Sequence, residues 1–99
     1  LNDTSDIALK KDIESISISC IDNIKQLNPV TFKWKDTSRK DIGFIAQEVE
    51  DILPELVDGE DGVKSINTTG LVAQLTKALQ EAISRIETLE AEVASLKSS

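Results

Sequence analysis

Residues 72–96, VAQLTKALQEAISRIETLEAEVASL, decide the architecture of this 99-residue chain. Apolar side chains recur at the first (a) and fourth (d) places of four consecutive heptads. The residues of this seam are Val72, Leu75, Leu79, Ala82, Ile86, Leu89, Val93 and Leu96. So narrow an apolar stripe leaves little to bury within one chain and is typical of a coiled coil. We expect a helix capped by Thr68 or Thr69 that runs to about Leu96.

Charged residues beside the seam favour parallel helices. Arg85 and Glu92 occupy g positions, and Glu90 and Lys97 occupy the e positions that follow. In a parallel assembly Arg85 of one chain faces Glu90 of the next, and Glu92 faces Lys97. Such exposed pairs mainly set orientation, because each adds little stability. The alternative is a terminal helix that packs on its own domain.

The seam alone does not set the number of helices. β-branched residues at a with leucine at d favour a dimer, but Leu79 at a and Ala82 at d depart from that pattern.

An antiparallel hairpin is expected upstream of this helix. Residues 30–35 alternate between apolar and polar side chains, which places Phe32 and Trp34 on one buried face. Residues 36–39 have turn chemistry, and residues 41–45 are interpreted as the returning strand.

Short elements surround the hairpin. We expect a first helix that is opened by Ser5 or Asp6 and runs through Ile7, Leu9, Ile13 and Ile16. A second helix is expected from Ile21 to Leu27, stopping near Pro29, and a third from Ala46 to Leu53, ended by Pro54. A short strand is expected from Val63 to Ile66. The predicted fold class is α+β: small helices plus an antiparallel β-hairpin, ending in a long C-terminal coiled-coil helix.

Composition argues against several classes of function. The net charge of −7 disfavours binding to nucleic acid or to an anionic membrane, and no apolar run could span a bilayer. The chain has four glycines and no phosphate-binding loop, so no nucleotide is expected. Because it lacks methionine, we expect a segment of a longer polypeptide or a product cut from one.

No metal or other cofactor is expected. The chain has no histidine, and its single cysteine, Cys20, is expected to be a buried core residue. Residues 58–62 have a weak likeness to a calcium loop. Gly62 and Thr69 fall where that loop needs oxygen ligands at its fifth and twelfth places, so a polar turn is expected instead.

Ser5-Asp6-Ile7-Ala8-Leu9-Lys10 places a hydroxyl five residues before a lysine. Without histidine, only a lysine could serve Ser5 as a base. The alternative is that this segment merely caps a helix. Five residues along a helix turn by roughly 140°, so a Ser5–Lys10 pair requires either an extended segment that folds back or a lysine from another chain. Lys11 is the spare candidate.

Several segments together resemble a known family. They are Leu27-Asn28-Pro29-Val30, Phe32-Lys33-Trp34, Ile42-Gly43-Phe44-Ile45-Ala46-Gln47-Glu48-Val49, Leu53-Pro54-Glu55-Leu56-Val57, Leu71-Val72 and Ala78-Leu79-Gln80-Glu81, together with Ser5-Asp6 and Leu9-Lys10. Across essentially its whole length the chain resembles the self-cleaving intramolecular chaperone domain at the C-terminus of phage endosialidase tailspikes, neck appendages and tail fibres. A related domain occurs in myelin regulatory factor. One departure is Thr68, where such domains often have a tyrosine.

The resemblance implies a homotrimer that helps an upstream parent polypeptide to fold and then cuts itself off. It would be a single-turnover serine endopeptidase with Ser5 as nucleophile and Lys10 as base. Thr4, Ser5 and Asp6 would form the cleavage site. The Thr4–Ser5 bond suits attack by Ser5 on its preceding carbonyl, and the Ser5–Asp6 bond is the alternative. It also implies a virion tail precursor assembled in the host cytoplasm, from which the domain is released.

The implied domain organisation has three parts. Residues 1–5 would end the parent segment, residues 6–67 would form a small α+β chaperone domain, and residues 68–99 would form the trimerisation helix. The alternative function is a permanent, non-catalytic trimerisation or fibre-tip module.

Overall fold

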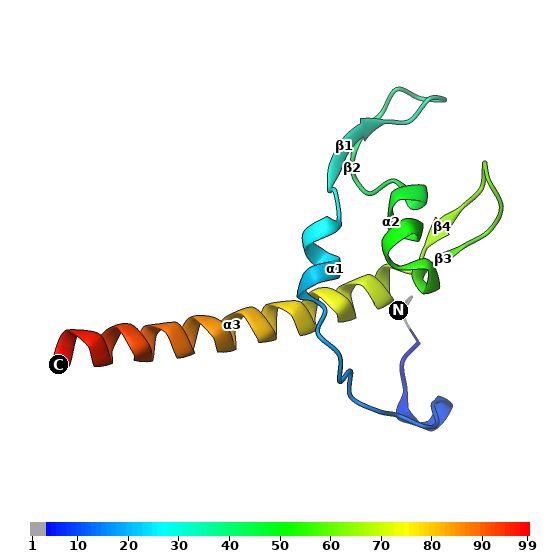
Figure 1. The fold of residues 1–99 in the computed structure, drawn as a ribbon. Helices are drawn as coiled ribbons and strands as arrows, with labels where there is room; N and C mark the ends of the chain where they lie inside the picture. The colour runs from blue at the N-terminus through cyan, green and yellow to red at the C-terminus, as the bar shows by residue number, and fades with distance from the viewer. Residues whose placement is uncertain (1–3) are drawn as a thin grey trace.

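The computed structural model describes residues 4–99. It is an α+β fold with two separate antiparallel pairs of strands and one long C-terminal helix (Figure 1). The elements are a 3₁₀ turn at Ile7–Leu9, α1 (Ile21–Gln26), β1 (Val30–Lys33), β2 (Lys40–Gly43), α2 (Ala46–Ile52), a 3₁₀ turn at Pro54–Leu56, β3 (Val57–Asp58), β4 (Ser65–Ile66) and α3 (Thr68–Ser98). Of the predicted terminal segment 1–5, residues 1–3 lie outside the described residues.

The long helix forms as the heptads predict, but with a different cap. The Asn67 side chain accepts a hydrogen bond from the Gly70 backbone N–H at 3.0 Å. Thr68 and Thr69 already belong to α3, so the predicted threonine cap is wrong. Asparagine is as good an N-cap as threonine. The Asn67 N–H also donates to the Leu56 carbonyl at 2.7 Å, and this contact holds it just outside the helix.

A small core joins the first turn of α3 to the segments before it. Its buried residues are Val49, Leu53, Leu56, Val57 and Leu71. The predicted helix before Pro54 is confirmed as α2, and the predicted strand shortens to β4. β4 pairs with β3, which the sequence pattern did not indicate, through Val57 opposite Ile66. The predicted polar turn at residues 58–62 is confirmed as the loop of this second hairpin, where Gly59 and Gly62 have positive φ angles.

The first hairpin is confirmed, with Val30 opposite Gly43 and Lys33 opposite Lys40. The predicted burial of Trp34 is wrong, because its side chain is 44% exposed. Trp34 lies one residue beyond β1, where the hairpin projects away from the body (Figure 1). Its ring packs edge-on against Phe32, with 5.0 Å between the ring centroids.

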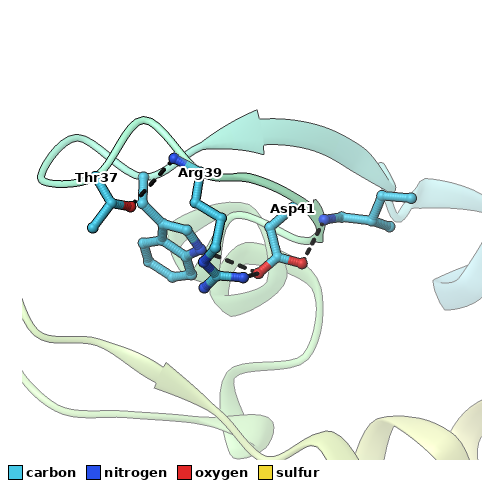
Figure 2. A network of polar contacts seen from close by, with 5 residues as sticks. Thr37, Arg39 and Asp41 are labelled. Carbon is cyan, nitrogen blue, oxygen red and sulfur yellow. Dashed lines mark hydrogen bonds and ion pairs between the residues drawn. The ribbon is translucent and has the colours of Figure 1, made fainter.

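Asp41 organises the tip of this hairpin (Figure 2). Its carboxylate accepts hydrogen bonds from the Trp34 indole N–H at 3.1 Å and from the Ile42 backbone N–H at 2.8 Å. Arg39 forms an ion pair with the same carboxylate at 3.4 Å. The bond from Ile42, followed by that from Trp34, holds the pKa of Asp41 below its ordinary value.

Acid should therefore loosen the tip. Because the pKa of Asp41 is lowered in the folded chain, its stabilising contribution is present above the ordinary value of 3.8 and is lost as the pH falls through the lowered pKa. We expect the fluorescence of Trp34, the single tryptophan, to change in this acid range while the helix content by circular dichroism is kept. Asp41→Asn keeps an oxygen acceptor but cannot titrate, so it should remove the change. A change that persists in this variant would assign the titration to another group.

Residues 4–19 form an arm that leaves the body as a loop (Figure 1). The predicted helix through Ile16 is wrong: only Ile7–Leu9 form a 3₁₀ turn, and all residues of the arm are exposed. Asp6 caps this turn by accepting a hydrogen bond from the Ala8 N–H at 2.8 Å, one of the two caps predicted. A short helix without tertiary packing is marginal, and the apolar side chains of Ile7, Leu9 and Ile13 are at least 63% exposed.

Candidate functional site

Ser5 and Lys10 meet within one chain. Lys10 Nζ donates a hydrogen bond to Ser5 Oγ at 2.6 Å. The turn capped by Asp6 reverses the chain, and Lys10 itself is extended (φ −120°, ψ 149°), so its side chain returns to the start of the turn. Of the two geometries left open by the sequence, the structure has the segment that folds back. The catalytic role of the pair stays a prediction.

The surroundings of this pair are open to solvent. Thr4, Asp6 and Lys11 are exposed along with Ser5 and Lys10. Asp6 is engaged as the cap of the turn, and Lys11 follows it in the irregular part of the arm. Ser5 Oγ and Lys10 Nζ therefore lie within hydrogen-bond distance, but the rest of the described chain does not bury them. Burial is what usually favours the neutral form of a catalytic lysine.

The arm is attached to the body at Cys20, whose predicted burial is confirmed at 0% exposure. The Cys20 backbone N–H donates to the Glu81 carboxylate on α3 at 2.9 Å. Burial raises the pKa of the Cys20 thiol, and the nearby Glu81 carboxylate adds to the rise. The free thiol is therefore a packing residue, and Glu81 is the contact that sequence reasoning missed. The only hint of this contact in the sequence was that Glu81 lies outside the heptad seam.

The seam of α3 lies open along the described chain. Seven of its residues have exposures from 39% at Leu75 to 75% at Leu96, and Ala82 is half-buried. The small domain packs instead on the neighbouring face, through Leu71 and Ala78. α3 thus packs against its own domain with one face and leaves the apolar seam exposed on another. The predicted interface residues are all available to other chains.

Other sites that the sequence raised are not built from the described residues. Residues 4–99 contain no cluster of three or more metal-ligating side chains. Lys64 lies over the 58–62 loop, where its Nζ binds Glu50 at 3.1 Å and the Gly59 carbonyl at 3.3 Å. Within the same range no helix has the length and apolar character that crossing a bilayer requires.

Comparison with known proteins relates the chain to a family and to a phage protein. A family model described as chaperone of endosialidase matches residues 5–58, a range that contains Ser5, Lys10 and the first hairpin. The long tail fiber protein Gp37 of Salmonella phage S16 is 32% identical over 109 aligned residues. These cover 98% of this chain but only 14% of that protein, so the chain spans a small part of its relative's length.

Proposed function

This chain belongs to the chaperone-of-endosialidase family, and from that premise we propose that it is the chaperone segment of a phage tail fibre polypeptide. It trimerises through the seam of α3, assists the folding of its upstream parent, and is then released by autoproteolysis at Ser5. The observation that carries this proposal is the 2.6 Å contact of Lys10 Nζ with Ser5 Oγ in the matched range.

The proposed reaction starts with neutral Lys10 taking the proton from Ser5 Oγ. The oxygen attacks the carbonyl carbon of Thr4, and the Thr4–Ser5 peptide bond breaks as Lys10 returns the proton to the Ser5 nitrogen. This step leaves an ester between Thr4 and Ser5. Water then hydrolyses the ester to a Thr4 carboxylate and a Ser5 hydroxyl. The chain's own residues thus supply nucleophile, base and acid.

Assembly would control this reaction. A lysine acts as a base when burial beside other groups favours its neutral form. The pair is exposed in the single chain, so neighbouring chains would have to cover it. Cleavage would then follow assembly.

The chaperone role has a physical basis in α3. Long fibres with many non-local strand pairings fold slowly and expose unpaired edges. A coiled coil joining three chain ends raises their effective concentration and sets their register. One chaperone segment is used for each parent chain, and the folding of that segment provides the driving force. Its removal afterwards leaves the fibre kinetically stable.

The second candidate is a permanent trimerisation module. Asp6 already explains the 3₁₀ turn as a cap, and the exposed Ser5–Lys10 pair could be a surface hydrogen bond alone. The seam would serve this function equally well.

A Ser5→Ala variant of the parent polypeptide separates the two. We expect the unchanged parent to yield a fragment of the size of this chain on a denaturing gel, while Ser5→Ala stays whole. Ser17→Ala, which alters another exposed serine of the arm, is the matched control and should be cut normally. A parent that remains whole under conditions where it is assembled would favour the permanent module.

A further inference from the structure

The root of the arm is fixed to α3 by one carboxylate. Glu81 accepts a hydrogen bond from the Cys20 N–H at 2.9 Å, across 61 positions of sequence. The Cys20 side chain beside it is fully buried. The residues of the arm up to Ser19 are exposed, so Cys20 is the point at which the arm joins the body.

Glu81 is ionised at neutral pH when it accepts the hydrogen bond from the Cys20 N–H. The Ser19 hydroxyl, then the Cys20 N–H, lower the pKa of its carboxyl, with Lys77 and Arg85 on the same helix adding smaller effects. It occupies a c position, outside both the seam and the charged flanks, so coiled-coil packing does not account for it.

The contact also gives the arm a direction. Ser15 and Ile16 line a shallow groove with Ala73, Thr76, Lys77 and Gln80 of α3. Ala73 and Gln80 are b positions and Lys77 is an f position, so this groove lies mainly on the side of α3 that faces away from the seam. The arm therefore leaves along the outer side of α3 and does not cover the seam.

We propose that Glu81 is a positioning residue for self-cleavage: by holding Cys20 on α3, it fixes the root of the arm that carries Ser5 and Lys10 beside the helix that assembles. This role rests on the proposed function. The tether from Cys20 to Lys10 is ten residues, which span at most about 33–36 Å. Because Cys20 is fixed on α3, the Ser5–Lys10 pair must stay within about that distance of α3.

The test measures cleavage and attachment of the arm separately. In the parent polypeptide, Glu81→Ala should slow cleavage by roughly tenfold or more, because misplaced reacting groups lose rate steeply. Glu81→Gln keeps an oxygen acceptor for the Cys20 N–H and should restore most of the rate. Glu87→Ala, which removes an exposed carboxylate of the same helix, is the matched control and should cut normally.

The second readout is the rate at which a thiol reagent labels Cys20, the single cysteine. We expect the fastest labelling in Glu81→Ala. Glu81→Gln loses only the charge that raises the pKa of the Cys20 thiol, so the difference in labelling rate between the two variants reports the hydrogen bond. Ser19→Ala, a milder change, should slow cleavage severalfold and serves if Glu81→Ala fails to assemble.

Two results would overturn the positioning role: assembled Glu81→Ala chains that cut at the parent's rate, or a Gln variant no better than Ala. A purely structural contact would lower stability and leave the cleavage rate of assembled chains unchanged. If the parent itself is never cut, the proposed function fails and this role with it. The labelling rates would then report only on the attachment of the arm.

Discussion

Lys10→Arg should abolish cleavage of the parent polypeptide while leaving its assembly intact. Arginine can still donate a hydrogen bond to Ser5 Oγ, which Lys10 contacts at 2.6 Å, but it does not lose its proton in a protein. The change therefore keeps the charge and removes the base. We expect no fragment on a denaturing gel and an unchanged oligomer by light scattering.

Lys11→Arg is the matched control, because it alters the neighbouring exposed lysine in the same way. It should cut nearly normally. If Lys10→Arg is cut as fast as the parent, the dyad assignment is wrong and the segment is only a capped turn.

Mixed assemblies test whether the pair acts within one chain. Chains with Ser5→Ala lack the nucleophile, and chains with Lys10→Arg lack the base. Because the structure joins Ser5 and Lys10 of the same chain, a mixture of the two variants should remain uncut. Recovered cleavage would mean that the base comes from a neighbouring chain.

Leu89→Asp should dissociate the assembly. Leu89 is a d residue of the seam and is 58% exposed in the single chain, so only other chains could bury it. A trimer would then enclose one unpartnered carboxylate per chain, at a cost on the order of 3–5 kcal/mol each. We expect light scattering at micromolar concentration to change from a trimer to a monomer, with cleavage lost at the same time.

Thr88→Asp is its control, because it adds the same charge one residue earlier, off the seam. It should remain trimeric. A Leu89→Asp variant that stays assembled would show that the seam is not the interface, and an unchanged chain that is a monomer or a stable dimer would contradict the trimer itself.

Local patterns predicted those parts of the fold that need no distant partner. The heptad period specifies α3 because a helix places every third or fourth residue on one side. The alternation from Val30 specifies the first hairpin for the corresponding reason in a strand, and Pro54 ends α2 where it must. The family, too, could be predicted from short motifs along the chain.

Contacts between distant residues decided the rest. Asn67 caps α3 because the Leu56 carbonyl holds it, and Trp34 is exposed because no element covers that end of the hairpin. The apolar spacing from Ile7 suggested a helix, yet Ile7, Leu9 and Ile13 are largely exposed and the segment forms only one turn. That turn brings Lys10 to Ser5, and Glu81 secures the arm across 61 positions. Periodicity records which face of an element is apolar, whereas only the tertiary structure determines what, if anything, lies against that face.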